Sequence, residues 1–383
     1  MIIAANVPGP ADVRIFAGFA KAITVYGPIR IYEHPLPGLP VYNHPPLAGW
    51  MLLGLNGLSE LGMSFGTLIR SPASIADFLC ALLVFEIVRR RATQTSAVLC
   101  GIGVAVSPVL IATSGYHGNT DAVAIVFALA AAHLLADRKS PLAAGVAAAL
   151  SISVKFIPAV VIPALFVAAL RGGRPVLVRF AAGFGALFAL VWGPVLVTVP
   201  QDLKANVLEY AGGSYRLWGL VRFADAFGLP ESVITFMQGG GHFLFVLVCV
   251  AAGAWLAWLR PAQLPGVVAV TLALLLLLSP ASGLQYLTWA AAGTFVLGLR
   301  EGLAFNGVAG LLAVFGYSGR SAVRWSEPVL ELGAAGWLVL AAGLATGVRR
   351  ILATQPGTPP QAPAGRSALS APRTTQASGS AVN

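Results

Sequence analysis

Few side chains in this chain could do acid–base chemistry, and the first is Asp12, in the run Pro10-Ala11-Asp12-Val13-Arg14. An aromatic and amphipathic stretch follows it, as expected for a helix lying on a membrane surface. A carboxylate there could remove a proton from an acceptor hydroxyl. Aspartate is also a preferred helix N-cap, and the residue pattern taken alone favours the cap.

A second candidate is His44, in Tyr42-Asn43-His44-Pro45-Pro46-Leu47. Pro45 restrains the backbone of His44, and Pro46 can begin a helix. The motif by itself is explained by a helix start. The functional alternative is that the His44 imidazole binds substrate from the rigid segment that precedes the helix.

The run His117-Gly118-Asn119-Thr120-Asp121 is predicted at the outer end of a hairpin between two spans. Asp121 opens the descending helix, where a carboxylate favours the N-terminal dipole. The side chains of His117, Asn119 and Asp121 could also hydrogen-bond a sugar or a phosphate. The two roles are compatible.

Lys155 lies in the apolar stretch Ser151–Pro158. An ammonium at membrane depth costs a few kcal/mol, so such a residue usually has a partner or faces a cavity. Pro158 breaks the helix just beyond it, near the outer surface. Snorkelling is one explanation. Contact with a lipid-linked phosphate is the one we favour.

Two later segments add polar groups on the outer side. The loop 200–240 carries Arg216 beside Trp218, and Gln285 with Tyr286 opens a span after Ser279-Pro280. Aromatic residues commonly anchor a chain at the interface. Arginine beside aromatic rings would also suit phosphate and sugar contacts.

The composition requires a membrane to hold these elements. Residues are 57% hydrophobic and 10% charged, against about 25% charged in soluble domains. The chain is therefore expected to be an all-α, polytopic helix bundle. We expect about eleven spans, near 72–89, 96–114, 121–136, 141–154, 157–170, 178–199, 241–259, 265–281, 286–299, 303–317 and 330–347.

Arginine clusters fix the orientation, because positive charge marks the cytoplasmic side. Placing clusters such as Arg89-Arg90-Arg91 inside makes residues 1–71 an extracytoplasmic first loop, with Pro45–Leu61 an interfacial or re-entrant helix. Residues 72–350 form the bundle, and 351–383 form a disordered cytoplasmic tail. The outside N-terminus lacks a signal peptide. We expect a further helix upstream of Met1, the alternative being unaided translocation.

Several function classes find no support. The net charge of +10 suits cytoplasmic loops and anionic lipid, and no aromatic-interleaved basic patch indicates nucleic acid. The sequence contains no DxD, HxxxH or HExxH metal motif, no P-loop and no GxSxG. No cofactor is predicted, and dependence on a divalent metal is left open. The cysteines Cys80, Cys100 and Cys249 fall in apolar segments and do not read as disulfides or a zinc site.

All these candidates lie on one predicted face, and their order resembles a family. The sequence resembles the GT-C superfamily of membrane glycosyltransferases in five successive motifs. They are an aspartate before a surface helix, a Y-x-x-P-P-L-type element, a G-x-x-D hairpin, a lysine before F-x-P, and S-P…Q-Y-L-x-W. Within it, the chain is most similar to bacterial polyprenyl-phosphate-mannose-dependent mannosyltransferases. The resemblance covers roughly residues 10–300. One departure is His44, where the family often has tyrosine.

The resemblance implies a function and a site. Asp12 would be the general base, and a hexose, mannose by the resemblance, would pass with inversion from a polyprenyl-phosphate donor to a glycan or glycolipid hydroxyl. Lys155 or Arg216 would stabilise the leaving phosphate. The protein would be multi-pass in a bacterial plasma membrane, with its site on the extracytoplasmic face. The alternatives are a transporter or flippase for a lipid-linked sugar and a scaffold without chemistry.

Overall fold

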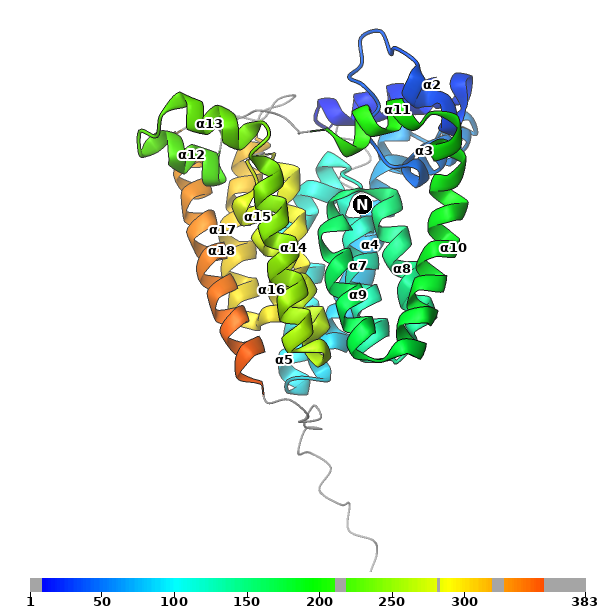
Figure 1. Ribbon diagram of the computed structural model, residues 1–383. Coiled ribbons are helices and arrows are strands. Elements are labelled where there is room, and N and C mark those ends of the chain that lie inside the picture. The colour runs from blue at the N-terminus through cyan, green and yellow to red at the C-terminus, as the bar shows by residue number, and fades with distance from the viewer. Residues whose placement is uncertain (1–8, 211–217, 281–282, 319–326, 355–383) are drawn as a thin grey trace, which may run out of the picture.

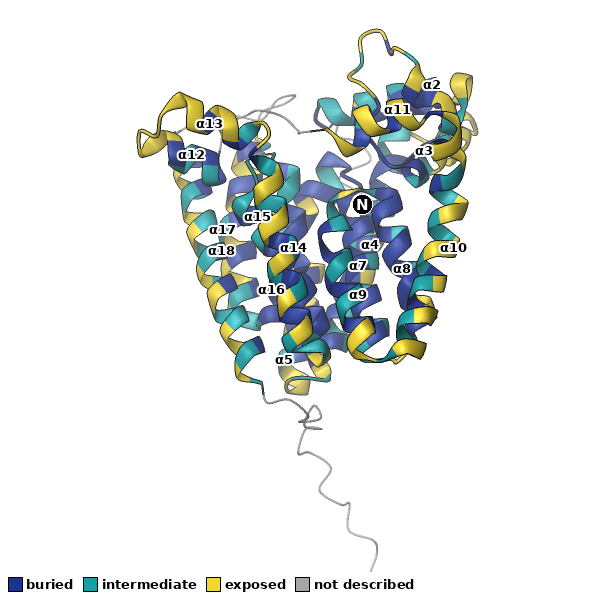
Figure 2. Ribbon diagram, viewed as in Figure 1, coloured by how far each residue is buried: buried dark blue, intermediate teal, exposed yellow. Residues whose placement is uncertain are grey.

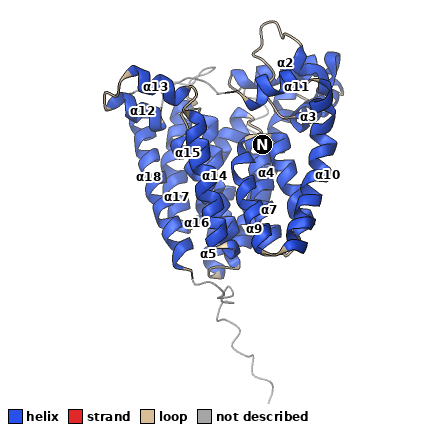
Figure 3. Cartoon of the chain, in the orientation of Figure 1, coloured by secondary structure: helices blue, strands red, loops and turns tan. Residues whose placement is uncertain are grey.

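The computed structural model describes residues 9–210, 218–280, 283–318 and 327–354. Within these ranges every regular element is a helix (Figure 3). The expected all-α fold is therefore confirmed for the described part of the chain. Long apolar runs bounded by Pro and Gly produce this result, because only a helix satisfies its own backbone hydrogen bonds inside a bilayer.

The helices fall into two groups by position (Figure 1). One group lies at one end of the bundle, and the other runs along its length. The end group comprises α2 (Ala11–Arg30), η1 (Ile31–Glu33), α3 (Pro46–Glu60), α11 (Pro200–Leu203), η4 (Lys204–Leu208), α12 (Gly219–Ala226) and α13 (Glu231–Gln238).

The helices of the bundle follow the order of the predicted apolar segments. They are α4 (Phe65–Arg89), α5 (Gln94–Ala105), α6 (Pro108–Leu110), η2 (Ile111–His117), α7 (Asp121–Ala136), α8 (Pro141–Val154), η3 (Ile157–Val161), α9 (Ile162–Arg171), α10 (Arg174–Thr198), α14 (His242–Leu259), η5 (Pro261–Gln263), α15 (Leu264–Leu278), η6 (Leu284–Leu287), α16 (Thr288–Leu297), α17 (Leu299–Gly316) and α18 (Glu327–Ala353).

By length and composition, six helices among the described residues could cross a membrane. They are Phe65–Arg89, Gln94–His117, Arg174–Thr198, His242–Leu259, Pro261–Leu278 and Glu327–Ala353. Helices such as α8, with 14 residues, extend only about 21 Å at 1.5 Å per residue. The total of eleven crossings stays a prediction.

Helix α4 begins earlier than expected. The sequence predicted a start at Pro72, but the helix begins at Phe65 and carries Pro72 inside it. Proline can be tolerated within a membrane helix because neighbouring groups can satisfy the backbone group that it frees. The predicted boundary between the first loop and the bundle, at 71/72, therefore falls within α4. The predicted boundary between the bundle and the tail, at 350, likewise falls within α18, which ends at Ala353.

Apolar side chains face outward along the bundle. On α10, Leu190 is 71% exposed and Val197 is 85% exposed, and Figure 2 shows exposed positions running down this helix. Such a surface suits lipid. Inside, α8 and α10 touch backbone to backbone. A side chain at Gly145 would collide with the carbonyl of Phe180, and one at Gly183 with that of Leu142.

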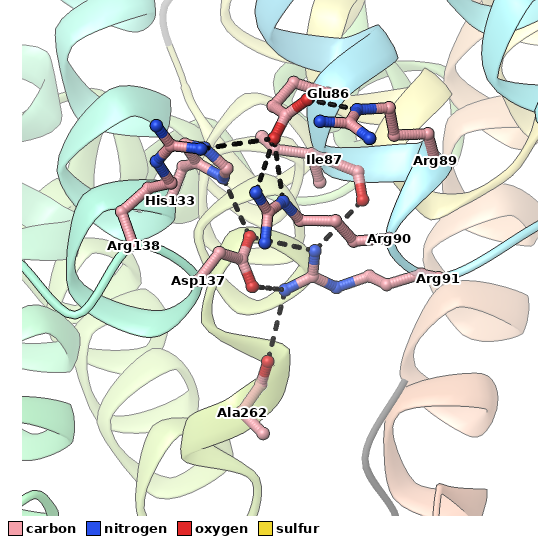
Figure 4. Close-up of polar contacts among 9 residues, drawn as sticks. All are labelled: Glu86, Ile87, Arg89, Arg90, Arg91, His133, Asp137, Arg138 and Ala262. Atoms are coloured by element: carbon pink, nitrogen blue, oxygen red, sulfur yellow. Dashed lines mark hydrogen bonds and ion pairs between the residues drawn. The ribbon is translucent and has the colours of Figure 1, made fainter. Parts of the chain in front are cut away.

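The end of the bundle opposite α2 and α3 is held by a charged cluster (Figure 4). Arg91 forms a two-pronged bond to Asp137, at 2.7 and 3.0 Å, and donates to the carbonyl of Ala262 at 3.2 Å. His133 Nδ1 lies 2.8 Å from the same carboxylate. The cluster ties α4 and α7 to the chain before α15. Its other side chains are Glu86, Arg89, Arg90 and Arg138.

We expect Asp137→Asn to lower the free energy of unfolding by about 3 kcal/mol at pH 7, because it leaves Arg91 without its counter-ion. Burial raises the pKa of the Asp137 carboxyl, but His133 and Arg91 lower it, and the net pKa lies below its ordinary value. The stabilisation is therefore full above the unfolded pKa of about 3.9 and is lost as pH falls through the lower, folded pKa.

Thermal unfolding in detergent at pH 7 and pH 3 measures this difference. The control is Asp225→Asn, because Asp225 forms an exposed ion pair with Arg222 of the kind that contributes little. A Tm for Asp137→Asn equal to that of Asp225→Asn at pH 7 would contradict the prediction.

Candidate active site

Asp12 lies in the first turn of α2, not at its N-cap. Pro10 is the N-cap residue and makes no side-chain cap bond. The Asp12 carboxylate instead reaches across to the bundle, where Oδ2 lies 2.9 Å from His117 Nε2. The side chain is 41% exposed. The cap interpretation is therefore wrong, and the carboxylate is available to a bound molecule.

His117 is placed by an unusual stretch of helix. Residues Ile111–His117 form a π-helix, a feature often found at functional sites. Gly118 then reverses the chain with φ of +77°, a conformation that glycine adopts without strain. Arg70 Nε donates to the carbonyl of Tyr116 at 2.9 Å and fixes the end of this segment.

Lys155 and Asp121 form an ion pair between the ends of α8 and α7. Lys155 is the C-cap of α8, and its Nζ lies 3.6 Å from Asp121 Oδ1. Trp289 Nε1 donates to Asp121 Oδ2 at 2.6 Å. The Asp121 side chain is 2% exposed and that of Lys155 22%. The ammonium thus remains accessible while its partner is buried.

His44 joins this pair from the start of α3. Its Nδ1 lies 3.4 Å from Lys155 Nζ, and its ring stacks on Phe16 with a centroid distance of 5.2 Å. Tyr32 donates to the His44 carbonyl at 2.8 Å. Burial, and then the charge of Lys155, hold the pKa of His44 well below its ordinary value. His44 is therefore a neutral imidazole beside a cation.

Asn119 links two of the predicted segments. Its Oδ1 accepts from the backbone N–H of Asp121 at 3.3 Å, and its Nδ2 donates to the carbonyl of Gln285 at 3.2 Å. Tyr286 stacks on Trp289 at 4.6 Å. The amide of Asn119 thus links the first residue of α7 to η6.

One cavity of about 550 Å³ brings most of these side chains together. It lies between the end group of helices and the bundle, with apolar residues such as Phe243 and Val246 of α14 in its wall. The predicted site residues that line it are Asp12, His44, Asn119, Lys155, Gln285 and Tyr286.

The remaining predicted residues are placed differently. His117 and Asp121 are 5% and 1% exposed. They do not line the cavity but contact the residues that do, His117 with Asp12 and Asp121 with Lys155. Arg216 lies outside the described residues. The sequence analysis missed Tyr317, whose hydroxyl lies 2.9 Å from His117 Nδ1. An aromatic residue at the end of a span reads as an interface anchor, so no sequence signal singles it out.

Burial raises the pKa of the Asp12 carboxyl, but the hydrogen bond and charge of His117 and the charge of Lys155 lower it, for a net value below the ordinary one. The carboxylate is therefore ionised at neutral pH and able to accept a proton. Across the described ranges, no three His, Cys, Asp or Glu side chains gather as metal ligands. The site combines a base, a cation and hydrogen-bonding groups in a largely apolar pocket.

Comparisons with known proteins bear on this site. Residues 43–197 match the family model of dolichyl-phosphate-mannose-protein mannosyltransferase. No curated protein matches the sequence. A solved structure, ArnT from Cupriavidus metallidurans bound to undecaprenyl phosphate, aligns with a TM-score of 0.49 and 13% identity over 90% of this chain and 73% of that one. The segment that matches the family model contains His44, Asn119, Asp121 and Lys155.

Proposed function

We propose that this protein transfers a hexose from a polyprenyl-phosphate donor to a hydroxyl of a glycan or glycolipid, with inversion at the anomeric carbon. The observation that carries the proposal is the single cavity holding both Asp12 and Lys155. In such a reaction the acceptor hydroxyl loses a proton and the leaving phosphate gains negative charge. A base and a cation in one pocket could serve these two needs. Mannose is the first sugar to test, because the matching family is described as using dolichyl-phosphate-mannose.

The reaction is a single displacement. Asp12 takes the proton of the acceptor hydroxyl as its oxygen bonds to the anomeric carbon. The bond between that carbon and the phosphate oxygen breaks, and polyprenyl phosphate leaves with the electron pair. Lys155 is assigned to the leaving phosphate, because a preorganised cation in a site with little water stabilises developing negative charge strongly.

Two features of the cavity support a lipid-linked donor. Its wall on α14 is apolar, with Phe243 and Val246, as the hydrocarbon chain requires. Lys155 is paired with the buried Asp121 but is itself accessible, so a phosphate can approach the ammonium. His44 is neutral and adds no charge, while its ring packs against Phe16.

A transfer assay tests the proposal. The purified protein in lipid nanodiscs receives radiolabelled polyprenyl-phosphate mannose and an acceptor extract from bacterial membranes, and the anomeric configuration of the product is determined by NMR. We expect labelled product with the configuration opposite to that of the donor. Retained configuration would overturn the single displacement, and transfer from polyprenyl-phosphate glucose alone would correct the sugar.

The proposed site faces the extracytoplasmic side, and cysteine labelling tests this orientation. Ser232 is exposed on α13, at the end that carries α2, and Thr95 is exposed at the other end of the bundle (Figure 1). The native cysteines are buried. We expect an impermeant maleimide to label Ser232→Cys in intact cells and Thr95→Cys only after lysis. The reverse pattern would invert the topology.

A further inference from the structure

Behind Asp12, two hydrogen bonds run in sequence through three separate elements. Tyr317, the C-cap residue of α17, places its hydroxyl 2.9 Å from His117 Nδ1. His117, at the end of η2, places Nε2 at 2.9 Å from Asp12 Oδ2. The His117 side chain is 6% exposed, against 41% for Asp12. His117 is thus enclosed, and only Asp12 among the three lines the cavity.

The chemistry of the carboxylate fixes the direction of the first bond. A carboxylate only accepts hydrogen bonds, so His117 Nε2 carries the hydrogen and donates it to Asp12. The Tyr317 hydroxyl, which can donate or accept, engages the other ring nitrogen and holds the imidazole in this orientation.

We propose that His117 and Tyr317 are positioning residues that orient the Asp12 carboxylate. This inference rests on the proposed function, in which Asp12 is the base. With Oδ2 held by His117, Oδ1 is left for the proton of the acceptor.

This role replaces the predicted contact between His117 and substrate. Both ring nitrogens are already within hydrogen-bond distance of protein groups, and the ring is absent from the wall of the cavity that Asp12 lines. A substrate would have to displace Tyr317 or Asp12 to reach it. The aromatic pair Tyr116 and Tyr317, with centroids 5.5 Å apart, closes the far side.

Transfer kinetics with polyprenyl-phosphate mannose test this positioning role. His117→Leu should lower kcat by about 10- to 100-fold, since a misplaced catalytic group can cost that much, while KM for the donor stays within a factor of two. His117→Gln keeps an N–H donor toward Asp12 and should recover most of kcat. Tyr317→Phe removes the hydroxyl that engages His117 Nδ1 and should lower kcat less than His117→Leu does.

Asp12→Asn in the same assay separates this inference from the proposed function. If Asp12→Asn transfers normally, the proposed function fails. If Asp12→Asn is inactive but His117→Leu has the wild-type kcat and pH profile, the function stands and the positioning role is wrong. Equal loss of kcat in His117→Leu and His117→Gln, with unchanged Tm, would also overturn it.

Discussion

Asp12→Asn is expected to lower the rate of sugar transfer by about 10²- to 10⁴-fold, the usual contribution of a general base. The asparagine amide is nearly isosteric with the carboxylate but cannot take a proton. The ionised state of Asp12 at neutral pH follows from its contacts with His117 and Lys155. Donor binding should change little, because the phosphate is assigned to Lys155 and not to Asp12.

The measurement is kcat and donor affinity for Asp12→Asn beside a matched control. Asp202→Asn serves as the control, since Asp202 lies in the first turn of α11, at the same end of the bundle, and does not line the cavity. We expect the control to retain wild-type transfer. Wild-type kcat in Asp12→Asn would exclude Asp12 as the base.

Lys155→Met is expected to have the largest effect on both stability and donor binding. It leaves the Asp121 carboxylate, 2% exposed, without its counter-ion and with Trp289 as a hydrogen-bond donor. Breaking one side of a buried ion pair costs about 3–5 kcal/mol. Loss of a charged contact to phosphate should weaken binding of polyprenyl phosphate by about 10- to 100-fold.

The double variant Lys155→Met with Asp121→Asn separates these two effects. Removing both charges should restore most of the Tm, because no buried charge remains unpaired, but should leave binding of polyprenyl phosphate weak. Lys21→Met is the control, since Lys21 is exposed on α2 and does not line the cavity. Recovery of both Tm and binding in the double variant would show that Lys155 acts only through the structure.

Much of the fold could be predicted from the sequence. Apolar segments separated by arginines specified the order of the bundle helices, and Pro45-Pro46 specified the start of α3 at Pro46. Asp121 opens α7, and Lys155 ends α8, as predicted. These features are local. They depend on hydrophobic run length, proline geometry and helix termini, which a few neighbouring residues determine.

The start of α4 could not be predicted in the same way. Pro72 is a local signal for a helix start, and the structure places it inside the helix. The residues before it include Arg70, which is 3% exposed and bonded to the carbonyl of Tyr116. The contact between Arg70 and Tyr116 therefore stabilises the first turns of α4, which the local sequence does not mark as part of a span.

The sequence by itself determined which residues could do chemistry and at which end of the helices they stand. Only the tertiary structure decided how they pair. Asp12 and His117 are separated by 105 positions, and His117 and Tyr317 by 200. Side chains so far apart meet through the packing of α2 and α17 against η2, and hydrogen bonding at that junction depends on distances of a few tenths of an ångström. Local patterns carry no information at that scale, so the roles of His117 and Tyr317 emerge only from the folded chain.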